Sequence, residues 1–230
     1  MVKNLATLIT LPNIKKQFPF AYDYLIKHKA KLNNPKRDIK PTPATPNEWH
    51  RYGRHQSLDS CGLPQKIIVG VLSVGDKYAI DVYGTLISSG GTAGYCVVAM
   101  PPDSEYNIYY LQAILNSKYL EWFSALYGEV FRGGYIARGT KVLKNLPIRK
   151  IDFTNKKDKA LHDKIVSIQK DLITTQDYID ANQGDKRKLT SLARTFETLK
   201  TELDAKLKKL YALGNDDLFI PLIKELYETN

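Results

Sequence analysis

A run of apolar residues spaced alternately three and four apart near the C-terminal end constrains this chain most. The run covers residues 161–210 and is interrupted by a polar segment at residues 182–185. Such spacing places apolar side chains on one face of an α-helix, and a short polar break between two such stretches is typical of a helical hairpin. The sequence therefore predicts two antiparallel helices of about 22 residues with a coiled-coil seam, turning near Gly184. A short third helix is expected at residues 216–227.

Short apolar segments with glycine-rich turns between them precede the hairpin. Residues 66–74 are almost continuously apolar, residues 77–83 alternate between apolar and polar, and residues 93–100 are apolar again. The close spacing favours a mostly antiparallel sheet, and the continuous segment indicates a strand buried on both faces.

Three further elements complete the expected fold. Apolar periodicity predicts helices over residues 18–32 and 104–127, and residues 146–148 are typical of a short strand. The predicted fold class is α+β: a mixed, mostly antiparallel sheet with packed helices, followed by an antiparallel helical hairpin. We expect one domain over residues 1–152 and a second, helical part over residues 153–230.

Charge is distributed unevenly along the chain. The 230 residues carry 34 Lys and Arg against 24 Asp and Glu, a net charge of +10. Residues 1–60 contribute +7, residues 61–150 contribute +3, and residues 151–230 are neutral. A segregated excess indicates that the first 150 residues face a polyanion such as nucleic acid and that the remainder does not. A basic protein with no such partner has the same totals, so charge alone leaves both interpretations open.

The composition excludes several classes of protein. Two cysteines and four scattered histidines match neither a disulfide scaffold nor the ligand spacing of a zinc cluster. The longest apolar stretch is about half of what a membrane-spanning helix needs, and no signal peptide is recognisable. No nucleophile–base set or metal-binding pair of carboxylates is legible, so no catalytic residue is assigned. We expect a soluble, cytoplasmic protein.

Two clusters combine basic and aromatic residues: RGGYIARGTK at 132–141 and WHRYGRHQ at 49–56. Arginine can form bidentate bonds to guanine edges, lysine and backbone N–H groups can hold phosphate, and glycines allow a backbone to approach a partner closely. Flexible loops with solvated charges would have the same composition. The candidate DNA-binding residues are Arg51, Arg54, Arg132, Gly133, Gly134, Tyr135, Arg138 and Lys141.

Within the first cluster, the glycines are expected to act through their conformation. Gly133 and Gly134 would let the chain turn sharply after Phe131, whose ring is expected to anchor the loop in the core. The basic and aromatic side chains of the cluster would then point outward, and an arginine that reads a guanine edge is the expected specificity contact. The alternative for Arg132 is a structural role, bonded to a carboxylate such as Glu129.

Short motifs follow one another in a recognisable order: FPFAYDYL at 18–25, WHRYGRHQ at 49–56, KIIV at 66–69, SSGGTAGY at 88–95, YLQAILNSK at 110–118, FRGGY at 131–135 and LPI at 146–148. Together with a helical tail over residues 158–213, they resemble the TaqI-like C-terminal specificity domain. That domain is the target-recognition region of adenine-specific DNA methyltransferases and of type II restriction–modification enzymes.

The resemblance implies sequence-specific recognition of double-stranded DNA on behalf of an N6-adenine methyltransferase, with or without a nuclease. The catalytic part would flip the adenine and use S-adenosylmethionine. Its glycine-rich cofactor loop and its Asn/Asp-Pro-Pro-Tyr/Phe quartet are not recognisable in this sequence. We therefore expect no cofactor in this chain, a methyltransferase domain or subunit upstream as partner, and a C-terminal fragment of a larger enzyme or a split gene.

Two other classes of function remain open on the sequence. One is a protein–protein adaptor that acts through its coiled-coil hairpin, with the basic half incidental. The other is an RNA-binding protein, because basic surfaces rich in aromatic residues suit stacking on single strands.

Overall fold

The computed structural model describes residues 8–34, 48–51, 63, 65–74, 78–85, 87, 94–101, 103–131 and 133–214. The chain forms two compact units, Met1–Ser60 and Cys61–Asn230. This division differs from the predicted boundary at residue 152, because the helical hairpin shares its core with the sheet. In the described part of the chain, no helix is long and apolar enough to cross a membrane.

The first unit contains three short helices: α1 (Leu11–Gln17), α2 (Pro19–Lys27) and α3 (Lys29–Leu32). The helix predicted over residues 18–32 is therefore present but interrupted at His28, and α1 was not expected. Helix α1 ends at Gln17 because the next residue, Phe18, precedes Pro19, and a residue before proline disfavours helical geometry. Trp49 is buried in this unit, with the Lys29 ammonium group 5.7 Å from its ring centre.

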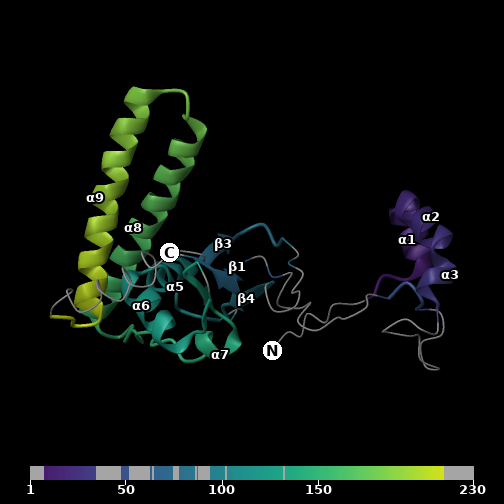
Figure 1. The fold of residues 1–230 in the computed structure, drawn as a ribbon, viewed down its shortest axis with the longest axis horizontal. Coiled ribbons are helices and arrows are strands. Elements are labelled where there is room, and N and C mark those ends of the chain that lie inside the picture. Colours follow the sequence, from purple (N-terminus) through teal and green to yellow (C-terminus); the bar gives the residue numbers. More distant parts are fainter. Residues whose placement is uncertain are drawn as a thin grey trace. The chain divides into compact units, whose positions relative to one another are not determined.

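Two small antiparallel sheets lie in the second unit, and Figure 1 labels the three strands of the first. The first has the strand order β3-β1-β4, formed by β1 (Lys66–Gly70), β3 (Tyr78–Asp81) and β4 (Tyr95–Ala99). The second has the order β2-β6-β5, formed by β2 (Leu72–Ser73), β5 (Val130–Phe131) and β6 (Tyr135–Ala137). The predicted fold class is confirmed.

The strand predicted over residues 66–74 divides between these sheets at Val71. The Val71 N–H donates to the Gly94 carbonyl, while the Val71 carbonyl accepts from the Arg138 N–H. Val71 thus bonds both sheets, and apolar periodicity cannot reveal this division because the apolar run continues across it. Residues 146–148 form no strand. The hydroxyl of Tyr211 donates to the Pro147 carbonyl at 2.7 Å in this segment instead.

The helix predicted over residues 104–127 is two helices, α5 (Ile108–Leu115) and α6 (Lys118–Tyr127). The interruption has two causes. Asn116 uses its side-chain amide to bond both the N–H and the carbonyl of Tyr78 in β3, at 3.2 and 3.1 Å. The Ser117 hydroxyl accepts from the Leu120 N–H and so caps the new helix. Local capping and a tertiary contact together override a continuous apolar stripe.

The predicted antiparallel hairpin is confirmed as α8 (Lys156–Ala181) and α9 (Lys186–Leu210), which run side by side in Figure 1. They are joined by residues 182–185, around Gly184 as expected. Asn155 and Asp185 cap the two helices by accepting N–H bonds from their first turns. The short helix expected at residues 216–227 lies outside the described residues.

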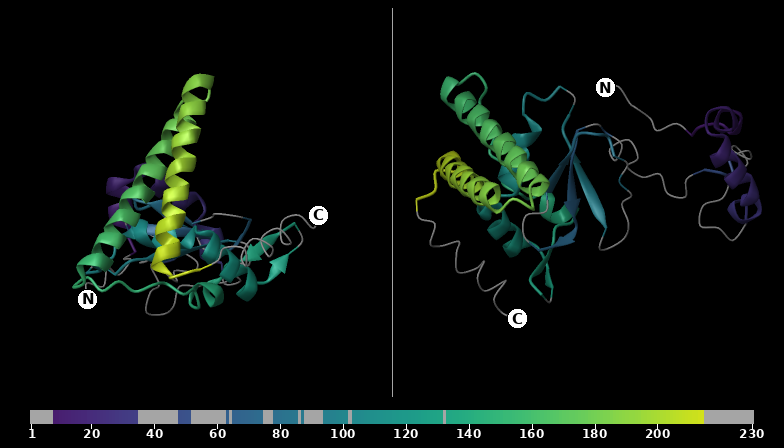
Figure 2. Two further views of the ribbon diagram at one scale, coloured as in Figure 1. Left: turned by 90° about the vertical axis from the view of Figure 1, so that its left-hand side faces the viewer. Right: turned by 90° about the horizontal axis from the view of Figure 1, so that it is seen from above.

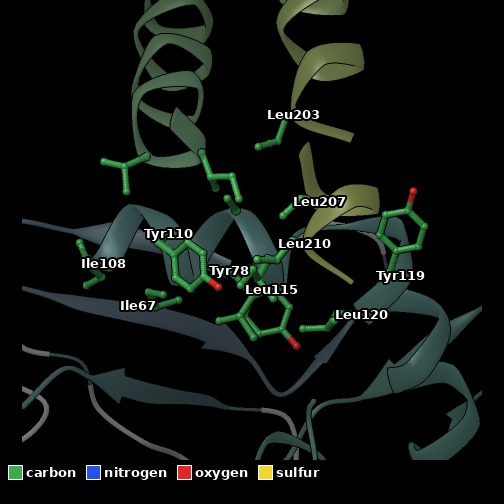
Figure 3. Close-up of a cluster of buried hydrophobic side chains, with 14 of the residues drawn as sticks. Ile67, Tyr78, Ile108, Tyr110, Leu115, Tyr119, Leu120, Leu203, Leu207 and Leu210 are labelled. Atoms are coloured by element: carbon green, nitrogen blue, oxygen red, sulfur yellow. The ribbon is translucent and has the colours of Figure 1, made fainter. Parts of the chain in front are cut away.

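The core of the second unit has three layers: the first sheet, helix α5 on its face, and the base of the hairpin on α5 (Figures 2 and 3). Leu203, Leu207 and Leu210 of α9 enter this core, whereas Leu199 and Phe196, nearer the tip, are only partly buried. Burying one leucine side chain contributes about 1.5–3 kcal/mol, so the hairpin is stabilised mainly at its base.

A buried ion pair ties β1 to β3. Lys66 and Asp81 lie opposite one another in the strand register, and the Lys66 ammonium donates to the Asp81 carboxylate. Asp81 also accepts from the N–H of Tyr83 and from the N–H and hydroxyl of Thr85. The bond from Lys66 is the main reason why the pKa of Asp81 falls to about 2. This pair therefore has a structural role at the end of β3.

Candidate nucleic-acid interface

The glycine-rich cluster at residues 132–141 contains a β-hairpin. Strands β5 and β6 pair antiparallel, with Phe131 opposite Tyr135. Gly133 and Gly134, in the turn between them, have φ values of +84° and +70°. Residues with side chains rarely adopt such values, so these glycines allow the tight turn through their conformation, as predicted. Gly134 is itself buried, while Gly133 is exposed.

The prediction that the Arg138 side chain points outward was wrong. Its side chain is 0% exposed, and the guanidinium is bonded inside the unit. Its Nη1 donates to the carbonyl and the hydroxyl of Ser73 in β2, at 2.6 and 2.8 Å, and its Nη2 donates to the Glu121 carboxylate in α6. Arg138 therefore connects the strand that follows the glycine turn to β2 and α6, and no part of it is presented to DNA.

The inward direction of Arg138 follows from strand geometry. Side chains two residues apart in an extended segment lie on the same face, and Ile136 is fully buried. Arg138 continues that face, whereas Tyr135 lies on the other. Glu121 on helix α6 is a second indication that Arg138 points inward. Its carboxylate lies on a largely apolar helix, and the residue is only 8% exposed. A glutamate on the buried side of a helix requires a cationic partner, and Arg138 supplies it.

A third polar group, the Tyr78 hydroxyl, lies under the hairpin in the field of Arg138 and Glu121. Burial is the main cause that raises the pKa of Tyr78 to about 12; the Arg138 guanidinium acts in the opposite direction, and the Glu121 carboxylate acts in the same direction as burial. The hydroxyl therefore stays neutral across the physiological range. The β5–β6 hairpin therefore rests on one buried ion pair and on neutral polar groups. These buried groups support its exposed side chains.

Both strands of the β5–β6 hairpin and the end of α6 carry exposed aromatic and aliphatic side chains. Phe131 and Tyr135, paired across the hairpin, are each 45% exposed, so the expected anchoring of the Phe131 ring in the core was wrong. We call the exposed set the hairpin ridge; it consists of Leu126, Tyr127, Val130, Phe131 and Tyr135. Several large apolar side chains exposed in one short segment mark an interaction surface more often than an ordinary solvent face.

Gly128 lets the hairpin begin directly against helix α6. A Cβ atom there would lie 2.7 Å from the Ser124 carbonyl oxygen and 2.8 Å from Cγ2 of Ile136. Both distances are shorter than van der Waals contact, so any side chain would push the hairpin away from the helix. This glycine, which the sequence alone did not single out, sets the position of the ridge.

The other predicted residues lie in three different situations. Lys141 is exposed on the short helix α7 (Thr140–Leu143), directly after the hairpin. Arg51 lies in the first unit, where its guanidinium forms a 2.9 Å ion pair with Glu48. Arg54 and Arg132 lie outside the described residues. The structure therefore brings Gly133, Gly134, Tyr135 and Lys141 together in one stretch, with Arg138 beneath them.

No group of His, Cys, Asp and Glu side chains that could hold a metal ion occurs among the described residues. His162 is buried among Tyr106, Tyr110 and Phe153. Its Nε2 accepts from the Asn107 N–H at 3.3 Å, and its Nδ1 lies 2.9 Å from a carboxylate oxygen of Asp163. With both ring nitrogens engaged and little exposure, this histidine has a structural role.

Comparison with known proteins supplies the remaining evidence. The chain is 46% identical over 220 residues, 96% of its length, to the type II restriction enzyme and methyltransferase RM.Eco57I of Escherichia coli. It spans 22% of that relative's length. No protein-family model and no solved structure matches. The sequence is thus related to part of a protein that combines restriction with methylation.

Proposed function

We propose that this chain recognises duplex DNA, as the target-recognition region of an adenine-specific restriction–modification enzyme. The observation that carries the proposal is the β5–β6 hairpin, which has glycines at its turn, exposed aromatic side chains on its strands and a buried ion pair at its base. Similarity to a restriction enzyme and methyltransferase indicates the kind of enzyme that such a hairpin serves.

A two-stranded hairpin is one of the elements that can enter the major groove of DNA. The groove of B-DNA, about 12 Å wide, admits a two-stranded β-ribbon. Tyr135 can donate or accept a hydrogen bond through its hydroxyl, and the Phe131 ring can contact a thymine methyl group or stack on a base. Lys141, exposed on α7 directly after the β5–β6 hairpin, would hold a phosphate. The contacts proposed for Arg51, Arg54 and Arg132 rest on their places in the sequence.

The buried ion pair supports this role through rigidity. Groups that read base edges have to be held to a fraction of an ångström, so a reading element needs support from beneath. Arg138 provides it by joining the end of the hairpin to β2 and α6. Its place in the proposal is that of a positioning residue.

Chemistry on the base belongs elsewhere in this proposal. Both described sheets are antiparallel, and they do not fit the parallel strand–helix units that usually bind nucleotide cofactors at the carboxyl ends of their strands. We therefore assign S-adenosylmethionine and the flipped adenine to a methyltransferase domain or subunit outside this chain, with which this chain would act.

The test is selection of duplexes bound by the 230-residue chain from a random pool, followed by affinity measurements on the enriched sequence and on a scrambled one. Phe131→Ala and Tyr135→Ala should each weaken binding to the enriched duplex about tenfold and reduce discrimination against the scrambled one. Tyr178→Ala is the matched control, because Tyr178 is 58% exposed on α8 and does not belong to the β5–β6 hairpin. Enrichment of no sequence, or equal effects of all three variants, would contradict the proposal. Preference for single-stranded RNA would favour the RNA-binding alternative.

A further inference from the structure

The C-terminal part of the chain is neutral in total, but its charges are not evenly mixed. Where the start of α8 and the end of α9 meet beside residue 149, they enclose a shallow groove of about 630 Å³. Its lining includes five cationic side chains and a single carboxylate, Asp158; the cations are Arg149, Lys157, Lys164, Lys206 and Lys209. We call this the basal groove. Its local charge is strongly positive although residues 151–230 carry no net charge.

Most of these cations are not neutralised within the described part of the chain. Lys164 forms an ion pair with Glu202 at 3.0 Å. Among the described residues, no carboxylate lies within ion-pair distance of Arg149, Lys157, Lys206 or Lys209. Several unpaired cations in one concave site repel one another, which an anionic ligand would relieve.

The helix ends do not account for the positive field. The N-terminal end of α8 carries partial positive charge, but the C-terminal end of α9, which carries partial negative charge, meets it at the same groove. The two contributions oppose each other, so the attraction for anions comes from the side chains themselves.

The walls of the groove belong to the rigid part of the unit. Leu210 and its neighbour Leu207 are buried in the core. The carbonyl of Arg149 accepts a 2.9 Å hydrogen bond from the buried Tyr110 hydroxyl, which holds the backbone of this arginine in place. Leu161 and Ala160 supply apolar surface along which the lysine stems can lie while their ammonium groups face outward.

We propose that the basal groove binds the phosphodiester backbone of duplex DNA, as a sequence-independent anchor separate from the hairpin ridge. Apart from Asp158, the lining described here holds lysines, one arginine and aliphatic side chains but no aromatic residue, which suits phosphate contact and offers no stacking surface for bases. The inference rests on the proposed DNA-binding function. It differs from the expectation from charge totals that residues beyond 150 take no part in binding a polyanion.

The experiment compares two double variants of α9 that remove the same charge. Lys206→Gln with Lys209→Gln changes the groove. Lys186→Gln with Lys200→Gln, both exposed on the same helix and outside the lining of the groove, is the control. Affinity for the enriched duplex and for a scrambled duplex is measured over a range of salt concentrations. Thermal unfolding of both variants checks that the fold is kept.

The groove variant should weaken binding to both duplexes about equally, on the order of tenfold per lost contact at 0.1 M salt, and should lower the salt slope by about 0.9 per contact. The control should leave both quantities close to those of the unmodified chain. As a second readout, duplex DNA should protect Lys206 and Lys209, but not Lys186 and Lys200, from an amine-reactive label detected by mass spectrometry.

The outcomes separate this inference from the proposed function. If the chain binds duplexes but the groove variant matches its control, or the groove lysines are not protected, the anchor is refuted and the hairpin proposal stands. A groove variant that loses affinity for the enriched duplex alone would also refute a sequence-independent anchor. If the unmodified chain binds no duplex at any salt concentration, both proposals fail together.

Discussion

Removing the charge of Arg138 should cost more stability than any substitution on the surface of the second unit. In Arg138→Met the Glu121 carboxylate, only 8% exposed, loses its cation, and the Ser73 carbonyl loses its 2.6 Å donor. Breaking a buried ion pair on one side typically costs about 3–5 kcal/mol, because the remaining charge stays buried without compensation. We expect a loss of that size in the free energy of unfolding.

The double variant Arg138→Met with Glu121→Leu separates a buried charge from a lost volume. Apolar residues of similar size often replace a buried pair at little or no cost, so the double variant should recover most of the stability that the single variant loses. Urea unfolding followed by far-ultraviolet circular dichroism measures the unmodified chain, the single variants Arg138→Met and Glu121→Leu, and the double variant. Lys159→Met is the control, because Lys159 and Asp163 form an exposed pair for which we expect about 0.5 kcal/mol or less.

Two results would refute this reasoning. A cost below about 1 kcal/mol for Arg138→Met would mean that the Arg138–Glu121 ion pair does not stabilise the β5–β6 hairpin. Strictly additive costs of the Arg138 and Glu121 substitutions would mean that the two side chains are not coupled.

Three further predictions concern the same unit. Leu207→Ala should cost about 2–5 kcal/mol in urea unfolding and Leu199→Ala clearly less, because only the former is fully buried; equal costs would contradict a hairpin stabilised at its base. Gly128→Ala should destabilise by about 1–3 kcal/mol, while Gly139→Ala, whose Cβ would meet nothing within 4 Å, should be nearly neutral in the same assay. Burial raises the pKa of Tyr78 from 10.0 to about 12, so its contribution is present below pH 10 and lost as the pH rises toward 12. Tyr78→Phe should therefore flatten the alkaline decline in unfolding free energy, and an unchanged decline would show that Tyr78 does not contribute to it.

Part of the candidate site was predictable from the sequence and part was not. Gly133 and Gly134 were recognisable because only glycine adopts positive φ freely, whatever surrounds it. The direction of Arg138 was not, because the cluster was interpreted as a loop. Strand alternation places Arg138 on the inner face only once the tertiary structure shows that Ile136, two residues before it, is buried. The close approach that requires Gly128 depends on where α6 and β6 meet, which no local pattern encodes.

The sequence by itself determined the elements whose stability is local and periodic. The hairpin α8–α9, with its turn at residues 182–185, follows from a repeated apolar spacing, capping residues and a polar break, all read within a few turns of helix. The existence of mostly antiparallel strands between residues 66 and 100 follows in the same way from short apolar segments and glycine turns.

Only the tertiary structure decided where those elements divide and which charges are buried. Val71 switches sheets because its N–H and carbonyl find partners at Gly94 and Arg138, and the helix stops at Asn116 because that side chain bonds Tyr78 in β3. Net charge likewise concealed the basal groove, whose cations come from residues up to sixty positions apart in the sequence. Hydrogen bonds and electrostatic forces act between neighbours in space, and which groups become neighbours is set only when the chain has folded.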